Sequence, residues 1–233
     1  MLISSVTKFS LVEFPWLTSC IIFTPWCNFR CNYCHNPEFV RWDLIAKNSN
    51  NLISQTAFFN FLQKRVWLLD GVSICWGEPT LQKWLVEFCQ KVKSMWFKVK
   101  LDTNWTNPEL LQELFSLKLL DYVAMDIKTN IINYDKIVWV KAAFDFQKSI
   151  EIIRNSWVDY EFRTTLIKWF HEEEDILDIV KNMIFKAKKY CLQNFKPTKL
   201  LDENFTWESF TQKELENFKK IVWDNVLNCE IRN

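Results

Sequence analysis

The sequence predicts an α/β fold, a partial (β/α)6 TIM-like barrel with parallel strands. Three observations lead to this prediction: strand and helix patterns alternate, 233 residues suffice for one sizeable domain, and polar motifs follow the ends of several strand patterns. Short connections between these patterns favour a curved and partly closed sheet. No linker or low-complexity tract interrupts them, so we expect a single domain over residues 1–233.

Six short apolar runs rich in β-branched residues are expected to be the strands. They cover residues 18–24, 71–75, 98–102, 121–127, 159–166 and 189–195. Each run is followed by a segment with helical features, and this alternation is typical of parallel sheets. In such barrels the reactive groups lie at the carboxyl ends of the strands, in the loops that lead to the helices.

Apolar faces and end signals mark the helices. Apolar residues repeat at helical spacing within residues 57–62, 81–92 and 176–184. Asn107 before Pro108 is typical of a helix start, and Thr211 with Glu214 fits a capping box that opens the last helix. We expect this helix and a tail to occupy about residues 205–233.

Charge and hydropathy exclude several classes of protein. The chain has 29 Lys and Arg against 28 Asp and Glu, so no overall field attracts nucleic acid or an anionic membrane. Residues 1–16 lack the regions of a signal peptide, and no apolar run approaches the length of a membrane span. We therefore expect a cytoplasmic protein without nucleic-acid or membrane partners, whose clustered cysteines are metal ligands or catalysts rather than disulfides.

Glycine and tryptophan are present in abnormal amounts, 2 and 13 residues respectively. Average glycine usage of ~7% would give roughly sixteen residues. Trp96, Trp105 and Trp157 stand where a turn or helix end favours glycine. We hypothesise that the gene uses UGA for glycine and that these letters are glycines translated as tryptophan; the alternative is a protein rich in tryptophan. The hypothesis predicts tryptophans in turns or helix ends, often exposed or at positive φ, and a core that does not depend on them.

Three cysteines lie close together in the stretch TPWCNFRCNYCHNP, residues 24–37. Cys27, Cys31 and Cys34 have the spacing C-x3-C-x2-C, which can bind three irons of a 4Fe–4S cluster and leave the fourth open. A c-type haem attachment through CNYCH would require export, and a zinc site shared by Cys34 and the adjacent His35 would be strained. The other cysteines do not pair at ligand spacing and are expected to be small packed residues.

The cysteine motif, with Tyr33 before its last cysteine, resembles the signature of the radical S-adenosylmethionine superfamily. CWGEP, residues 75–79, is similar to the glycine-glycine-glutamate-proline motif of that superfamily. Three further segments, VKLDTNWTNPE, DYVAMDIK and DYEFRTTL, extend the similarity. Together with the two motifs, they show that roughly residues 5–200 resemble the activating proteins of anaerobic ribonucleoside-triphosphate reductases. The resemblance implies a radical SAM fold and an iron–sulfur enzyme that cleaves S-adenosylmethionine reductively to methionine and a 5′-deoxyadenosyl radical. That radical would generate a glycyl radical on a partner enzyme.

The same resemblance implies the site residues. One 4Fe–4S cluster would be bound by Cys27, Cys31 and Cys34. S-adenosyl-L-methionine would be bound by Tyr33, Trp76, Gly77, Glu78, Asp102, Thr103, Asn104, Asp126, Lys128 and Arg163. Gly77 and Glu78 would accept hydrogen bonds from its amino group. Lys128 could instead be a solvated loop lysine, and Tyr33 could simply support its loop.

We identify no catalytic residue beyond the cluster, and His171 is interpreted as a capping or surface residue. The implied partners are a glycyl-radical enzyme, indicated to be an anaerobic ribonucleotide reductase, and a low-potential electron donor such as flavodoxin or ferredoxin. Two other functions remain open: a radical enzyme that acts on another glycyl-radical enzyme or on a small molecule, and a non-catalytic metal-binding module.

The chain also departs from the family pattern. Trp26, Trp76 and Trp105 replace glycines in the loops closest to the cosubstrate, where a side chain would block the close approach of the backbone. No cysteine lies between Cys34 and Cys75, so the ferredoxin-like segment of some related activators is missing.

Overall fold

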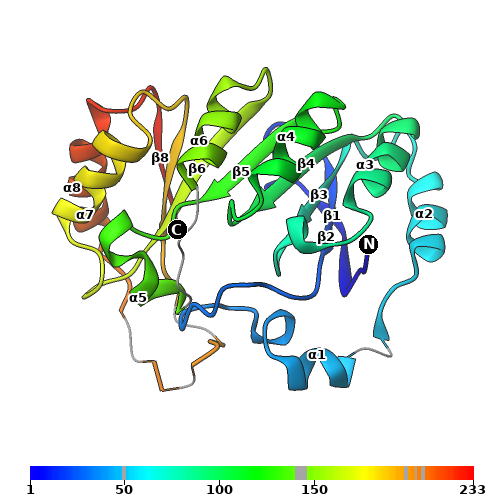
Figure 1. The fold of residues 1–233 in the computed structure, drawn as a ribbon, viewed down its shortest axis with the longest axis horizontal. Coiled ribbons are helices and arrows are strands. Elements are labelled where there is room, and N and C mark those ends of the chain that lie inside the picture. The colour runs from blue at the N-terminus through cyan, green and yellow to red at the C-terminus, as the bar shows by residue number, and fades with distance from the viewer. Residues whose placement is uncertain (49–50, 140–145, 197–198, 203, 206–207) are drawn as a thin grey trace.

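An eight-stranded sheet forms the centre of the protein and curves into an open partial barrel (Figure 1). The computed structural model describes residues 1–48, 51–139, 146–196, 199–202, 204–205 and 208–233. The strands lie in chain order, so that each strand pairs with its neighbours in the sequence. The expected α/β architecture with a partial barrel is confirmed.

All strands except the first run parallel. The antiparallel pair joins the first two strands, and each later strand is parallel to the one before it. The strands are β1 (Ser5–Ser10), β2 (Ser19–Phe23), β3 (Gly71–Cys75), β4 (Lys98–Thr103), β5 (Tyr122–Asp126), β6 (Asp159–Leu166), β7 (Tyr190–Asn194) and β8 (Cys229–Arg232).

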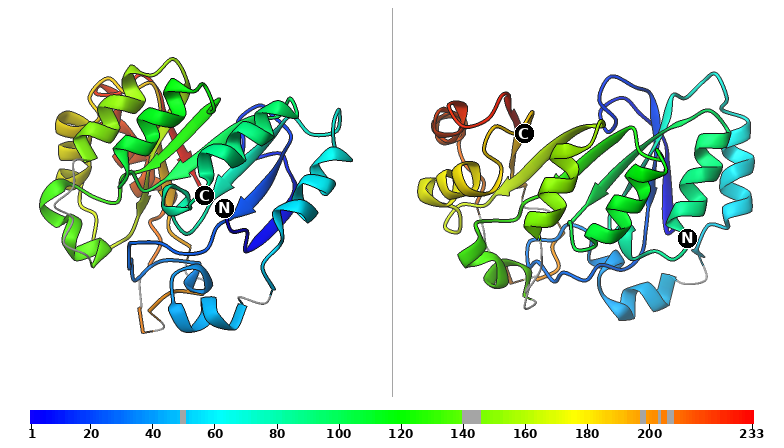
Figure 2. Two further views of the ribbon diagram at one scale, coloured as in Figure 1. Left: turned by 45° about the vertical axis from the view of Figure 1, so that its right-hand side comes forward. Right: turned by 45° about the horizontal axis from the view of Figure 1, so that its top comes forward.

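Helices fill the connections, and most of them lie on the outer side of the sheet (Figure 2). They are α1 (Trp42–Asn48), α2 (Gln55–Gln63), α3 (Leu85–Ser94), α4 (Pro108–Ser116), α5 (Tyr134–Val138), α6 (Phe146–Asn155), α7 (Glu173–Asp178) and α8 (Gln212–Trp223). A π-helical turn, Ile179–Met183, continues α7, and short 3-10 turns lie at Pro37–Phe39, Pro79–Leu81 and Ile131–Asn133. Within the described residues no helix has the length and apolar character needed to cross a membrane.

The six predicted strands are confirmed as β2 to β7, and both helix starts are confirmed. Asn107 accepts a hydrogen bond from the Leu110 N–H, and Thr211 forms the expected capping box. Two expectations are wrong. The tail after α8 is a strand, β8, which with the polar β1 makes eight strands rather than six. Leu81 lies in a 3-10 turn outside α3, because Trp84 at φ 70° separates the two elements.

The concave face of the sheet carries charged side chains that are paired with one another. Lys100 on β4 is 1% exposed, and its Nζ donates to Glu13 Oε1 at 2.9 Å and also to Asp102. Glu13 lies in the loop between β1 and β2, where the adjacent Phe14 packs against Tyr122. A buried amine costs free energy unless it is paired, so these carboxylates are what allow Lys100 to lie inside the barrel. The β1–β2 loop therefore closes the amino-terminal end of the barrel.

A second buried ion pair fastens the last strand to the middle of the sheet. Glu161 on β6 is 1% exposed, and both terminal nitrogens of Arg232 on β8 donate to its carboxylate at 2.7 Å. The Tyr122 hydroxyl donates to the same carboxylate at 2.9 Å. Burial by itself would raise the pKa of Glu161, but the hydrogen bonds and charge of Arg232 outweigh it and lower this pKa from 4.5 to about 2.

This lowered pKa makes the stability of the fold sensitive to acid. Because the folded state favours the ionised Glu161, its contribution is complete above pH 4.5 and is lost as the pH falls through the folded pKa, about 2. We expect a loss on the order of 2–3 kcal/mol in the free energy of unfolding over this range, measured from urea denaturation at several pH values.

The matched test replaces the arginine. Arg232→Met leaves a buried carboxylate with a weaker partner, so we expect it to lose roughly 3 kcal/mol at pH 7 and to flatten the acid dependence. Arg41→Met is the control, because the Arg41–Asp43 pair has side chains that are 44% and 51% exposed. A variant at Arg232 with the same pH profile as the unaltered protein would contradict this account.

The tryptophans follow the pattern that the glycine hypothesis predicts. Nine of the twelve within the described residues have positive φ, between 50° and 72°: Trp16, Trp26, Trp67, Trp76, Trp84, Trp96, Trp105, Trp139 and Trp169. Ten are at least 45% exposed. Such a backbone conformation is uncommon for any residue other than glycine, and an exposed indole gains little from burial.

Trp105 contradicts one part of the prediction, that the core does not depend on tryptophan. It is 1% exposed, and its Nε1 donates to the Tyr134 hydroxyl at 2.7 Å. The rings of Phe29 and Phe146 lie 5.7 and 5.2 Å from its own. The indole thus fills a space among aromatic residues although its φ is 72°. Trp207 lies outside the described residues.

Candidate active site

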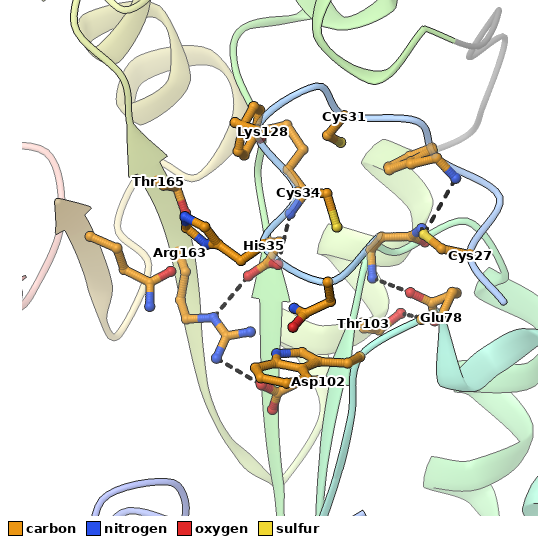
Figure 3. A pocket seen from close by; sticks show the side chains of 18 of the residues that line it. Cys27, Cys31, Cys34, His35, Glu78, Asp102, Thr103, Lys128, Arg163 and Thr165 are labelled. Carbon is orange, nitrogen blue, oxygen red and sulfur yellow. Dashed lines mark hydrogen bonds and ion pairs between the residues drawn. The ribbon is translucent and has the colours of Figure 1, made fainter. Parts of the chain in front are cut away.

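A cavity at the carboxyl ends of the strands brings the predicted site residues together. Its volume is about 540 Å³. Its lining includes every predicted residue: Cys27, Cys31, Tyr33, Cys34, Trp76, Gly77, Glu78, Asp102, Thr103, Asn104, Asp126, Lys128 and Arg163. These side chains come from the loop 24–37 and from the ends of β3 to β6, and Figure 3 shows how they face the same space.

The loop that carries the cysteines is held by backbone hydrogen bonds to distant segments. Its Arg30 N–H donates to the carbonyl of Val138 in α5 at 2.9 Å. The Cys34 carbonyl accepts from the Leu201 N–H at 2.9 Å, and the Cys34 N–H donates to Cys31 within the loop at 2.9 Å. His35 packs on the ring of Phe195, 5.4 Å away. The position of the cysteines therefore depends on the whole fold and not on the loop alone.

The three thiols are suited to an iron–sulfur cluster. Burial raises the pKa of the Cys31 thiol to about 12 and also raises the pKa values of Cys27 and Cys34, so the thiolates need a compensating positive charge. In a 4Fe–4S cluster each cysteine binds a different iron, whereas zinc draws all ligands to one point. The C-x3-C-x2-C spacing of the three thiols in one loop suits a cluster.

Gly77 and Glu78 join the cysteine loop to the sheet. A Cβ atom at Gly77, which has φ 60°, would lie 2.5 Å from the carbonyl oxygens of Thr24 and Trp26, so only glycine fits there. The Glu78 N–H donates to the Trp26 carbonyl at 2.6 Å. The end of β3 is thus packed directly against the residue that precedes Cys27.

The carboxylate of Glu78 braces the neighbouring loop. It is 1% exposed and accepts hydrogen bonds from the hydroxyls of Thr80 and Thr103 at 2.6 and 2.8 Å. It also accepts from the Asn104 N–H at 2.6 Å. Burial raises the pKa of Glu78, and these donors oppose that rise. The side chain therefore fixes the positions of Thr103 and Asn104 at the end of β4.

A chain of ion pairs crosses the floor of the cavity. Arg163 on β6 donates to Asp102 and to Asp126, at 2.8 Å in each case. Lys128 donates to the other oxygen of Asp126 at 2.8 Å. Burial opposes ionisation of Asp126, but Arg163 and Lys128 lower its pKa below the ordinary value. The alternative of a solvated loop lysine is wrong, since the Lys128 side chain is only 16% exposed.

His171 is buried, so its interpretation as a surface residue is wrong. Its Nδ1 accepts from the Ile167 N–H at 3.0 Å, and its Nε2 lies 2.8 Å from the Lys128 carbonyl. Burial lowers the pKa of His171, which favours the neutral ring with one accepting and one donating nitrogen. The residue supports the backbone that presents Lys128. The Tyr33 hydroxyl, by contrast, is buried without a hydrogen-bond partner among the described residues.

Sequence reasoning missed part of the cavity. Its lining also includes Glu13, Thr165, Gln193, Arg232 and Asn233. Glu13 belongs to a loop far from any motif, Arg232 belongs to the strand that was not predicted, and Asn233 follows that strand. Thr165 and Gln193 did carry a signal, because each lies near the end of a predicted strand.

The fold and the site together define an enzyme that holds an iron–sulfur cluster beside a bound cosubstrate. Residues 21–183 match the Radical SAM superfamily, and the chain belongs to it, within the family of glycyl-radical enzyme activating enzymes. This superfamily uses a 4Fe–4S cluster and S-adenosylmethionine, and the donor set around the cavity fits both groups.

Two curated relatives and one solved structure are similar to this chain. A Methanocaldococcus jannaschii protein named as a glycyl-radical enzyme activating enzyme is 32% identical, over 99% of this chain and 95% of the relative. The pyruvate formate-lyase-activating enzyme of Clostridium pasteurianum is 23% identical over 78% of this chain and 76% of its own. The structure of Streptococcus suis SuiB bound to S-adenosylmethionine shares the fold, with a TM-score of 0.62, 14% identity, and coverage of 91% of this chain and 52% of SuiB.

Proposed function

We propose that this protein generates a glycyl radical on an anaerobic ribonucleoside-triphosphate reductase, with electrons from a low-potential donor such as flavodoxin or ferredoxin. The observation that carries the proposal is the cavity in which three thiols at C-x3-C-x2-C spacing face a buried polar wall. Similarity to a glycyl-radical enzyme activating enzyme over 99% of the chain supports a protein as the substrate. The motifs that resemble reductase activators support this particular partner.

In this proposal Cys27, Cys31 and Cys34 hold the cluster and leave one iron open for the methionine moiety of the cosubstrate. When bound, the cluster would supply the one electron needed to cleave the sulfonium C–S bond to methionine and a 5′-deoxyadenosyl radical, and this radical would take a hydrogen atom from the partner's glycine. Gly77 and Glu78 face the amino group with a carbonyl and a negative charge.

The remaining residues orient and enclose the cosubstrate. Lys128 would pair with its carboxylate, and Asp126 and Arg163 hold Lys128 in place through the ion pairs of the cavity floor. Asp102, Thr103 and Asn104 would line the side braced by Glu78, Tyr33 would lie near the adenine, and Trp76 occupies a position where glycine would allow close backbone approach. Burial of Glu78, Thr103 and Asn104 excludes water from this side of the cavity. The whole chain, residues 1–233, serves as one radical SAM domain.

The identity of the partner enzyme is tested by measuring radical formation on each candidate. Reduced, cluster-loaded protein with S-adenosylmethionine is mixed under anaerobic conditions with the reductase or with pyruvate formate-lyase, and the glycyl radical is measured by electron paramagnetic resonance. We expect the signal on the reductase. The similarity to pyruvate formate-lyase-activating enzymes makes the second partner the direct alternative. A signal on pyruvate formate-lyase alone would replace the reductase, and 5′-deoxyadenosine without radical on either protein would favour a small-molecule substrate.

A further inference from the structure

One wall of the cavity has no role in the proposed handling of the cluster and cosubstrate. It is formed by the ends of β6, β7 and β8 and carries Thr165, Gln193 and Arg232. In Figure 3 Thr165 lies across the cavity from Cys27. A radical formed in the cavity must meet its substrate there, so this wall is the surface left for the substrate.

Thr165 and Gln193 stand side by side on this wall with unused polar groups. They are register partners on the parallel strands β6 and β7, and both are half-buried. Neither side chain forms a hydrogen bond within the part of the chain that the structure describes. The next residue, Asn194, differs sharply, because its amide donates to the Phe210 carbonyl at 2.9 Å and accepts from the Phe210 N–H at 3.0 Å. Asn194 is structural, whereas Gln193 and Thr165 are available to a ligand.

The electrostatics of the wall indicate an uncharged ligand. Arg163 is already paired with two carboxylates, and Arg232 is paired bidentately with Glu161. Among Thr165, Gln193 and Arg232, the free groups are therefore a carboxamide and a hydroxyl, which match neutral donors and acceptors better than a phosphate or a carboxylate. Lys196, which also lines the cavity, lies two residues beyond the end of β7 and outside this wall.

We infer that Gln193 and Thr165 bind the main chain of the partner segment that carries the reactive glycine. A carboxamide presents one acceptor and two donors, so Gln193 pairs with the C=O and N–H groups of a peptide unit, and the Thr165 hydroxyl binds a further main-chain group beside it. Main-chain recognition leaves the Cα hydrogens of glycine facing the cosubstrate. The inference rests on the proposed function and specifies how its protein substrate is held.

The test separates binding of the partner from cleavage of the cosubstrate. Gln193→Leu and Thr165→Val remove the polar groups with little change in volume, and Thr165→Ser restores the hydroxyl. Gln63→Leu, on the exposed end of α2, is the matched control. Each cluster-loaded protein is assayed for 5′-deoxyadenosine formed without a partner, and for the partner concentration that gives half the maximal rate of glycyl radical formation.

We expect Gln193→Leu and Thr165→Val each to raise the half-saturating partner concentration roughly three- to tenfold, the effect of one lost neutral hydrogen bond. Partner-free cleavage should stay within twofold of the unaltered protein, and Thr165→Ser should recover most of the loss. Unchanged half-saturation would overturn the inference, and so would a parallel loss of partner-free cleavage, which would assign these residues to the cosubstrate. If the unaltered protein cleaves the cosubstrate but forms no radical on any glycyl-radical enzyme, the proposed function fails and the inference fails with it.

Discussion

Replacement of Cys31 by alanine should abolish the cluster. The three thiols are presented by one loop that is fastened to α5 and to residue 201. All eight cysteines lie in the part of the chain that the structure describes, and among them only Cys27, Cys31 and Cys34 line the cavity. Two thiolates leave two irons of the cubane without protein ligands, and such a cluster does not persist. After anaerobic reconstitution we expect less than about a tenth of the iron and sulfide of the unaltered protein, with no 5′-deoxyadenosine formed.

Cys89→Ala is the matched control for this experiment. Cys89 is 0% exposed and lies in α3, outside the cavity lining. The control should lose some stability but keep its full complement of iron. Full iron content in the Cys31 variant, or a stable protein that takes up zinc and no iron, would contradict the assignment of the cluster.

The second large effect is expected at the tryptophans of the site. Trp26, Trp76 and Trp105 all have positive φ. Trp76 lines the cavity, and Trp26 and Trp105 are adjacent in sequence to the lining residues Cys27 and Asn104. The Trp76 ring packs against Phe23, with centroids 4.4 Å apart, and Trp26 packs against Trp42 at 6.0 Å. Changing these three to glycine relieves the left-handed backbone, and removing the Trp76 ring clears the approach to the cosubstrate. We expect the rate of reductive cleavage of S-adenosylmethionine to rise at least about tenfold, which corresponds to an activation free energy lower by ~1.4 kcal/mol.

Trp16, Trp67 and Trp96 provide a control with the same backbone conformation. They are 95%, 96% and 92% exposed and lie away from the cavity. Changing them to glycine should raise the urea midpoint, because each relieves on the order of 1 kcal/mol of strain, while cleavage stays unchanged. Equal cleavage before and after the changes at the site, or UGG codons at these positions in the gene, would refute the glycine hypothesis. Trp105→Gly is also tested alone. This change empties a packed space in the core, so it can lower the stability of the protein, whereas the changes at the exposed tryptophans raise it.

The motifs and the parallel core were predictable because their signals are local. A buried parallel strand appears in the sequence as a short apolar run, and the helix N-cap at Asn107 can be recognised from the proline that follows it. β8 was not predictable, because four residues carry too little pattern, and both its pairing with β7 and the ion pair of Arg232 with Glu161 depend on segments far away in the sequence. Glu13 was not predicted to line the cavity for the same reason, because its position depends on an ion pair with the distant residue Lys100. The indole of Trp105 was misjudged because its surroundings come from three separate segments.

The exposed Trp16 at the tip of the β1–β2 loop has a consequence for inheritance of the gene. If codon 16 is UGA, a cell that reads UGA as a stop signal would release a peptide of 15 residues, which contains β1 and none of the cysteines. The gene would then be silent in nearly every recipient that acquired it. Its lineage would be confined to organisms that share the altered code, and neighbouring genes with the same codons would be isolated together with it.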